Sequence, residues 1–337
     1  NRLVLPGVID MHVHFRDGNL AYKEDFRTAS MAMAAGGVTL GVDMPNNDPA
    51  VRDENSLAMR EELARKSLVD YMVNLPLDAS ESLIRRLGGV GEIFLYKNNI
   101  ADIHDRMKLL GDNIRFHLHP ETELSYDGEI EAIKKILSVK WGKKVYLCHV
   151  SMEESMRLIS RNKESFWVEV TPHHLLLSRE EHGDNVYASV RPPIRDRGDV
   201  EYLWRAIALG LVDTVASDHA PHLPEEKPDA PGIAGVQFML PLLLTEFERR
   251  ELPLTLLQKL MCENPASILK SGLRGAIFPG MLADLVAVTR ECYDIKELTP
   301  YSKMRVNPYS DFQADYRVWP VSYTHLRAHE TRHDLVC

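Results

Sequence analysis

Two histidines one residue apart end an apolar segment near the start of the chain, in the stretch VIDMHVHFRDG at residues 8–18. Alternate side chains of a β-strand point to one face, so His12 and His14 can share a metal ion. His119, His149 and Asp218 each end another strand-like segment. A single buried histidine is more often structural than ligating. Together, however, these residues predict a metal centre, in which nitrogen and oxygen ligands favour Zn²⁺, with Mn²⁺ or Co²⁺ as substitutes.

Strand-like segments alternate with amphipathic helical segments along most of the chain. We expect strands over residues 8–13, 38–44, 70–75, 92–97, 114–119, 144–149, 166–171 and 213–217. Segments between them, such as GEIEAIKKILSVKWG, repeat apolar residues at intervals of three and four, which is the helical period. This α/β alternation favours a (β/α)8 TIM barrel over an open doubly wound sheet. In such a barrel the C-terminal ends of the strands meet at one mouth, where the ligand types above would converge.

The alternation of strand-like and helical segments ends near the C-terminal end of the sequence. The stretch RGAIFPGMLADLVAV is short, turn-punctuated and strand-like. We therefore expect a catalytic barrel over residues 6–272 and a small flanking β-structure from residues 1–5 and 273–321. Because the chain opens NRLVLPG without an initiator methionine, we expect that β-structure to be truncated at its N-terminus. Residues 322–337, which end THLRAHETRHDLVC, have no recognisable period, and we expect a non-native or disordered tail.

Bulk composition excludes several classes of function. The formal net charge of −9 argues against nucleic acid or an anionic membrane surface as a partner. No apolar run approaches the roughly 20 residues that span a bilayer. We expect a cytoplasmic protein, because no signal peptide precedes the first strand and the four cysteines show no paired spacing.

Ordered motifs along the chain extend the metal-centre hypothesis. HVHFR is followed by KEDFRTASMAMAAGGVT, DMPNNDPAV, EVTPHHLLLS, RPPIRDRGDVEYLW, SDHAPHLPEEK, PGIAGVQFMLPLLL and ENPASIL. In these motifs the chain resembles the dihydroorotases, cyclic-amide hydrolases of the amidohydrolase superfamily, from Leu5 to about Val321. The resemblance implies the reversible, metal-dependent hydrolysis of (S)-dihydroorotate to N-carbamoyl-L-aspartate in pyrimidine biosynthesis.

The resemblance also implies roles for the residues at the strand ends. His12, His14 and Asp218 would hold one metal ion, and His119 with His149 a second, which gives one or two Zn²⁺ ions per subunit. A metal-activated hydroxide would be the nucleophile. Asp218 would accept its proton and later deliver that proton to the ring nitrogen that leaves.

The substrate of that family carries a carboxylate, and the sequence offers groups to bind it. Arg16 follows His14 by two residues and can bind a carboxylate with two hydrogen bonds, although an isolated arginine usually forms a surface salt bridge. By the resemblance, Asn46 and His222 would complete this site, while Asn46 could equally be a turn residue. The segment from Pro231 to Gly235 would contact the substrate ring through its backbone, or be an ordinary loop.

One position departs from the family pattern. Many relatives bridge two metals with a carbamylated lysine, and the matching position in GEIFLYKNN holds Glu92. Glu92 could bridge the ions with its own carboxylate, or it could be a solvated residue at a strand edge. Lys97 is a third candidate, but its odd separation places it on the opposite strand face. His173 and His174, in TPHHLLL, are expected to order a loop rather than to bind metal.

Two other functional hypotheses follow from the same residues. A hydantoinase or an allantoinase would share the metal ligands without needing Arg16, Asn46 and His222 in this arrangement. An inactive dihydroorotase-like scaffold subunit would typically have lost metal ligands, and only Glu92 favours it here. A homodimer, or an association with aspartate transcarbamoylase, is the expected assembly.

Overall fold

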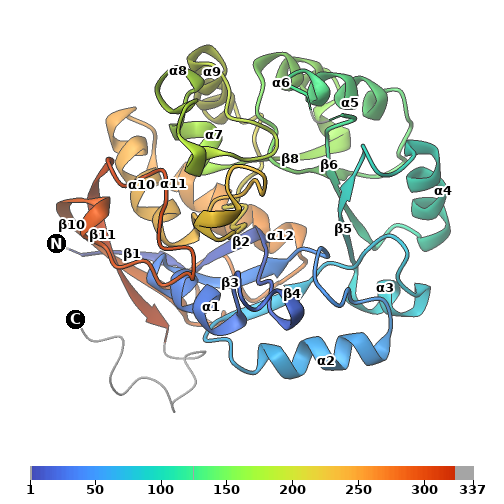
Figure 1. Ribbon diagram of the computed structural model, residues 1–337, viewed down its shortest axis with the longest axis horizontal. Helices are drawn as coiled ribbons and strands as arrows, with labels where there is room; N and C mark the ends of the chain where they lie inside the picture. The colour runs from blue at the N-terminus through green and yellow to red at the C-terminus, as the bar shows by residue number, and fades with distance from the viewer. Residues whose placement is uncertain (1, 124, 323–337) are drawn as a thin grey trace.

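Eight parallel strands form a barrel, and helices surround it (Figure 1). The structure is a computed structural model that describes residues 2–123 and 125–322. The barrel strands are β2 (Val8–Val13), β3 (Val38–Asp43), β4 (Asp70–Val73), β5 (Gly89–Phe94), β6 (Arg115–His119), β7 (Val145–Leu147), β8 (Phe166–Val170) and β9 (Thr214–Val215). This arrangement confirms the predicted (β/α)8 fold.

Two short bridges close the barrel. The hydrogen-bonded barrel strands form two sheets, β2-β3-β4 and β5-β6-β7-β8-β9, and all neighbouring strands in them are parallel. Leu75 pairs with Val90 at one junction, and Val13 pairs with His219 at the other. The second bridge joins the first barrel strand to the loop after the last one, so strand ends that are distant in sequence become neighbours.

One helix follows each barrel strand and covers the outside of the barrel. These helices are α1 (Phe26–Ala35), α2 (Glu54–Ala64), α3 (Glu81–Leu87), α4 (Ile100–Leu110), α5 (Gly128–Leu137), α6 (Glu153–Ser160), α9 (Arg197–Ala208) and α10 (Val236–Arg249). Shorter helices are α7 (Pro172–Leu176), α8 (Arg179–His182), α11 (Leu254–Gln258) and α12 (Asn264–Ile268), with a π-helical segment (Lys259–Glu263) between the last two. In α5, Ile130, Ile133 and Ile136 recur at intervals of three and are buried, as the helical period predicts.

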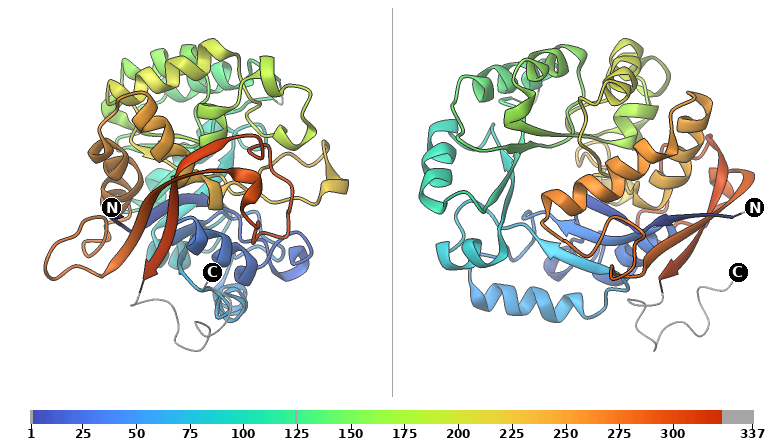
Figure 2. Two further views of the ribbon diagram at one scale, coloured as in Figure 1. Left: turned by 90° about the vertical axis from the view of Figure 1, so that its left-hand side faces the viewer. Right: turned by 180° about the vertical axis from the view of Figure 1, so that it is seen from behind.

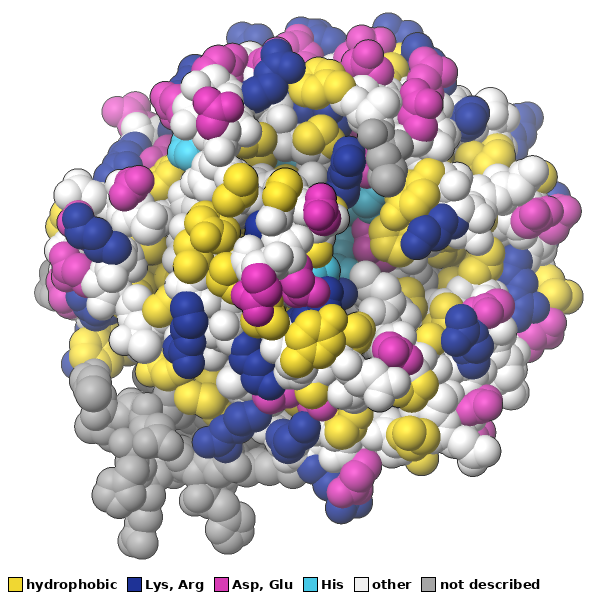
Figure 3. Space-filling model, viewed as in Figure 1, with side chains coloured by type: hydrophobic (Ala, Val, Ile, Leu, Met, Phe, Trp, Pro, Cys, Tyr) yellow, Lys and Arg dark blue, Asp and Glu magenta, His cyan; other side chains and the backbone are white. Residues whose placement is uncertain are grey.

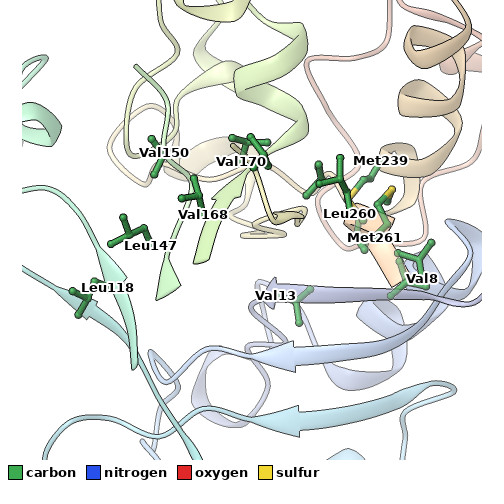
Figure 4. Close-up of a cluster of buried hydrophobic side chains, with 14 of the residues drawn as sticks. Val8, Val13, Leu118, Leu147, Val150, Val168, Val170, Met239, Leu260 and Met261 are labelled. Atoms are coloured by element: carbon green, nitrogen blue, oxygen red, sulfur yellow. The ribbon is translucent and has the colours of Figure 1, made fainter. Parts of the chain in front are cut away.

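The main hydrophobic core lies between the strands and the surrounding helices. Figure 4 shows buried side chains of this core from β2, β6 and β8, from α10 and from the π-helical segment. Among them are Val13, Leu118, Val170, Met239 and Leu260. Full burial of one such aliphatic side chain contributes about 1.5–3 kcal/mol, so this layer holds the strand ends in place.

A three-stranded antiparallel sheet stands beside the barrel, at the side where the chain begins (Figure 2). Its order is β1 (Arg2–Pro6), β10 (Asp284–Asp294) and β11 (Gln313–Ser322). The two ends of the chain were predicted to build such a flanking structure, and they do. Ser322, which we expected to begin the tail, is instead the last residue of β11. The rest of the predicted tail, residues 323–337, lies outside the described residues.

The largest difference between expected and observed strands lies in β5. We predicted residues 92–97, but the strand begins at Gly89 and ends at Phe94. The glycines of GGVGE suggest a turn, yet Gly91 belongs to the strand because a Cβ there would lie 2.2 Å from the carbonyl oxygen of His117. The shift moves Glu92 from the edge of the strand into its interior.

Among the described residues, none of the helices combines the length and the apolar character needed to cross a bilayer.

Candidate active site

The predicted metal ligands meet at one mouth of the barrel. His12 lies in β2, His119 ends β6, and His14, His149 and Asp218 lie just after the ends of β2, β7 and β9. Figure 3 shows histidine side chains at the bottom of a hollow. All five residues are buried, and the ring centroids of His12 and His14 are 5.4 Å apart. The fold therefore brings together side chains as far apart in sequence as His14 and Asp218, which are separated by 204 positions.

His12, His14 and Asp218 form the first potential metal-binding group. The Nε2 atoms of His12 and His14 lie 3.4 Å and 3.1 Å from the same oxygen, Oδ1 of Asp218. One ligand atom from each residue lies within 4.8 Å of the others. Two imidazole nitrogens and a carboxylate oxygen at this spacing can coordinate one divalent ion.

Glu92 belongs to a second group. Its Oε1 lies 2.5 Å from Nδ1 of His119 and 2.9 Å from Nε2 of His149, while its Oε2 lies 3.7 Å from Nε2 of His12. Glu92 is only 7% exposed, so it is not a solvated residue. Lys97 is exposed, and its ammonium lies over the ring of Phe94 at 5.1 Å from the centroid. The structure thus places Glu92, and not Lys97, among the histidines.

The hydrogen bonds of His12 show that this cluster fits a cation. Its Nδ1 lies 2.9 Å from Oε1 of Glu169, which can only accept a hydrogen bond when ionised. In the neutral ring Nε2 then carries a lone pair, and that buried atom has no hydrogen-bond partner among the described residues. It faces the carboxylates of Glu92 and Asp218. Lone pairs that converge in this way repel one another unless a cation lies between them.

The electrostatics of the cluster support the same conclusion. Burial disfavours the charged form of His12, but the carboxylates of Glu169 and Asp218 outweigh burial and hold its pKa well above the usual value. Burial would raise the pKa of Asp218 and of Glu92, yet His12 lowers the first and His119 lowers the second. Against burial, Glu92 also raises the pKa of His119 to about 9. The site is therefore anionic and attracts cations.

Two carboxylates that orient the histidines were missed in the sequence. Glu169 lies in β8 and also accepts a hydrogen bond from the backbone N–H of His149 at 2.9 Å. Oε2 of Glu121 lies 2.6 Å from Nε2 of His119. The only local signal for Glu169 is a charged residue in the apolar run FWVEV. Its contact with His12 spans 157 positions, which no local pattern reveals.

A cationic group lies beside the metal ligands. Nη2 of Arg16 is 3.1 Å from Nε2 of His222, and Arg16 is 6% exposed, which excludes the surface salt bridge. Burial together with Arg16 and Lys23 lowers the pKa of His222 to about 2, so this imidazole is neutral. Asn46 is exposed, and its Oδ1 lies 2.6 Å from Nδ1 of His14. The structure thus pairs Arg16 with His222, and Asn46 with a predicted metal ligand.

Comparisons with known proteins agree with this geometry. The profile described as the amidohydrolase family matches residues 3–315. The chain belongs to the amidohydrolase family. It is 35% identical to the dihydroorotase of Pyrococcus abyssi over 333 residues, which cover 94% of this chain and 81% of that protein. It is 34% identical to the dihydroorotase of Saccharolobus solfataricus over 92% of this chain and 80% of that protein. These relatives confirm the predicted dihydroorotase family, whose members are metal-dependent cyclic amide hydrolases.

Solved structures of amidohydrolases share the fold. L-hydantoinase (dihydropyrimidinase) from Arthrobacter aurescens superimposes with a TM-score of 0.86 at 22% identity, over 94% of this chain and 83% of that one. D-hydantoinase (dihydropyrimidinase) from Thermus sp. superimposes with a TM-score of 0.82, also at 22% identity. At such identities the likeness concerns the fold alone.

Three site residues of this amidohydrolase have left-handed backbone just after the ends of barrel strands. Arg16, His149 and Asp218 have φ angles of 54°, 36° and 44°, which are uncommon for residues other than glycine. Such conformations persist only where the surroundings hold them, and they concentrate at functional sites. Nη1 of the buried Arg60 donates to the carbonyl oxygen of Arg16 at 2.5 Å, while its Nη2 lies 2.6 Å from Asp43. This buried ion pair supports the turn that carries Arg16.

The remaining predicted residues lie around the same mouth. The segment from Pro231 to Gly235 runs beside the loop that follows Asp218, because the N–H of Ala220 donates to the carbonyl oxygen of Ile233 at 2.9 Å.

The two histidines after β8 have different surroundings. The ring of His174 lies 2.8 Å from the hydroxyl of Thr171 and 3.0 Å from the carbonyl oxygen of Pro192, so it holds two segments together. His173 is buried, and its ring nitrogens have no hydrogen-bond partner among the described residues.

Proposed function

We propose that this amidohydrolase catalyses the reversible ring opening of (S)-dihydroorotate to N-carbamoyl-L-aspartate with a divalent metal at the barrel mouth. One observation carries the proposal: a cluster of metal-ligand types lies beside the buried guanidinium of Arg16, whose Nη2 is 3.1 Å from Nε2 of the neutral His222. A cyclic amide that also bears a carboxylate fits this mouth, with its amide at the metal-ligand cluster and its carboxylate at Arg16 and His222. The dihydroorotase relatives support the same substrate.

We assign the metal ligands as two groups. His12, His14 and Asp218 would hold one ion, and Glu92, His119 and His149 a second. Zn²⁺ suits these nitrogen and oxygen atoms, and Mn²⁺ or Co²⁺ could replace it. A bound divalent ion would supply Lewis-acid polarisation of the ring carbonyl and activation of water.

Asp218 is the proposed general base. Its Oδ1 faces His12 and His14, which keep its pKa below the usual range in spite of burial, so the side chain is a carboxylate at neutral pH. Such a group can take a proton from the attacking water at its second oxygen, Oδ2, and pass it to the ring nitrogen that leaves. In ring closure the same atom acts in the opposite sense.

The cationic side of the mouth would orient the substrate. Arg16 and His222 would donate hydrogen bonds to its carboxylate, and Asn46 would join them from the same rim. The backbone between Pro231 and Gly235 would contact the ring, since this segment lies beside the loop that carries Asp218. Binding the carboxylate at a fixed place holds the amide against the metal ligands.

Turnover of three substrates tests the proposal. The zinc-loaded enzyme should open dihydroorotate with a kcat/KM at least a hundredfold above that for hydantoin or allantoin, because only dihydroorotate has a carboxylate to meet Arg16. Faster turnover of hydantoin would instead assign a hydantoinase. No turnover of any of the three, at full metal content, would favour an inactive scaffold subunit.

Assembly and location are separate proposals. A homodimer or a complex with aspartate transcarbamoylase can be distinguished by measuring the mass in solution, with and without that enzyme. A cytoplasmic location fits the buried free thiols of Cys148 and Cys262, which suit a reducing compartment.

A further inference from the structure

His222 lies between two cationic donors. Nη2 of Arg16 is 3.1 Å from its Nε2, and Nζ of Lys23 is 3.0 Å from its Nδ1. A guanidinium and an ammonium group can only donate hydrogen bonds, whereas a neutral imidazole has one acceptor nitrogen and one N–H. His222 can therefore accept from one of the two cations, and its N–H must point at the other.

Lys23 is the donor that the surroundings hold in place. Its Nζ forms an ion pair with Oε1 of Glu226 at 2.7 Å, and its side chain is 12% exposed. The neighbouring Glu24 is fully buried and accepts a hydrogen bond from the backbone N–H of Lys303 at 3.3 Å. Oε2 of Glu24 also lies 3.6 Å from Nε2 of His219. Residues 23 and 24 are thus anchored against the loop that follows Asp218.

Arg16 is less firmly held than Lys23 as a hydrogen-bond donor to the acceptor nitrogen of His222. Its Nε is buried without a hydrogen-bond partner among the described residues, so this guanidinium still has donors to satisfy. If Lys23 donates to Nδ1 of His222, the proton of the imidazole is on Nε2 and points at Arg16. Two donors directed at each other at 3.1 Å need a shared acceptor, and a carboxylate with its two oxygens is the group that satisfies both.

We propose that Lys23 is a positioning residue, which holds His222 as the Nε2–H tautomer so that His222 and Arg16 donate together to the substrate carboxylate. This inference rests on the proposed function. It assigns to Lys23 no contact with the substrate: Lys23 acts through His222, and Glu226 balances its charge at 2.7 Å. The geometry thereby adds a specificity determinant from the turn that precedes α1.

The tautomer can be measured directly. Long-range ¹H–¹⁵N spectra of zinc-loaded enzyme labelled with ¹⁵N-histidine distinguish a protonated from an unprotonated ring nitrogen, and a His222→Gln sample assigns the signals. We expect Nε2 protonated and Nδ1 unprotonated in the wild type. In Lys23→Met we expect a shift toward Nδ1–H, and in Lys23→Arg the wild-type pattern. An Nδ1–H tautomer in the wild type, or an unaltered tautomer in Lys23→Met, overturns the proposal.

Steady-state kinetics give a second readout. Lys23→Met should raise the KM for dihydroorotate about tenfold, the size expected for a lost hydrogen bond to a charged group, with a much smaller change in kcat. Lys23→Arg should restore most of the loss. The matched control is Lys134→Met, because Lys134 is an exposed lysine that is paired with Glu131 at 2.9 Å on α5. A loss in kcat alone, with KM unchanged, contradicts the positioning role.

Failure of the two proposals can be told apart. If the wild type does not turn over dihydroorotate, the proposed function fails, while the spectra still report the tautomer. If the wild type is active and Lys23→Met matches it in KM and in tautomer, only the role of Lys23 fails.

Discussion

Two regions of one barrel mouth use histidine in opposite ways. In the metal-binding region, carboxylates face His12 and His119 and, against burial, raise the pKa of both, that of His119 to about 9. In the proposed carboxylate-binding region, made of Arg16, Lys23 and His222, burial together with the two cations lowers the pKa of His222 to about 2. The charge of the neighbours, rather than the residue type, decides whether an imidazole helps to bind a cation or an anion.

His14 lies where the two regions meet. Its Nε2 faces Asp218 at 3.1 Å, and burial together with the charge of Arg16 lowers its pKa. A neutral imidazole is the form that binds a metal ion. Arg16, the proposed partner of the substrate carboxylate, therefore also helps to keep this proposed metal ligand deprotonated.

The largest effect is expected from the base in the metal-binding region. Asp218→Asn should lower kcat by about a thousandfold, because an amide cannot accept the proton of the attacking water. Metal content should stay largely intact, and Asp229→Asn, at an exposed position, serves as the control. Activity retained in full would exclude Asp218 as the base.

Removal of Glu92 tests how the second group holds metal. Glu92→Ala should lower the metal content per chain and reduce kcat/KM about a hundredfold, because His119 and His149 lose the carboxylate between them. The wild type should also load metal equally well in buffers with and without bicarbonate, since no lysine must be carbamylated. Unaltered stoichiometry in the variant, or a need for bicarbonate in the wild type, would refute the bridging role.

The carboxylate-binding region should respond in KM. Arg16→Ala should raise the KM for dihydroorotate by about ten- to a hundredfold, the cost of losing a charge-assisted hydrogen bond, and change kcat much less. Metal content should not change. A wild-type KM in this variant would place the carboxylate site elsewhere.

The smallest effect is expected from a residue that only orients a ligand. Glu169→Gln should weaken metal binding about tenfold, measured by competition with a chelator, because Nδ1 of His12 loses its charged acceptor at 2.9 Å. Glu164→Gln in the turn before β8 is a matched control. Equal metal affinity in Glu169→Gln and the wild type would show that the tautomer of His12 is set by other contacts.

Most of the fold could be predicted from the sequence because barrel strands and their helices have strong local periods. The strand predicted at residues 8–13 coincides with β2, and α5 shows its spacing in Ile130, Ile133 and Ile136. The predicted bounds of β5 were shifted because glycine also marks turns, so Gly91 was read as part of a turn. In the structure Gly91 lies within the strand, where it allows close contact with His117.

The candidate site was predictable only in part. The spacing of His12 and His14 identifies them as candidate metal ligands. Arg16 is identified by its place in the same motif. Glu169 and Lys23 do not, because their partners His12 and His222 are 157 and 199 positions away and no local pattern records the contact. Residues that orient ligands are set by tertiary structure, so they became visible only in the folded chain.

Metal content and dihydroorotate turnover, measured on the same preparation through chelation and reloading, test the central claim most directly. We expect turnover to fall in proportion to the metal removed and to return when Zn²⁺ is added back. Full turnover by metal-free protein would contradict a catalytic metal at the mouth of the barrel.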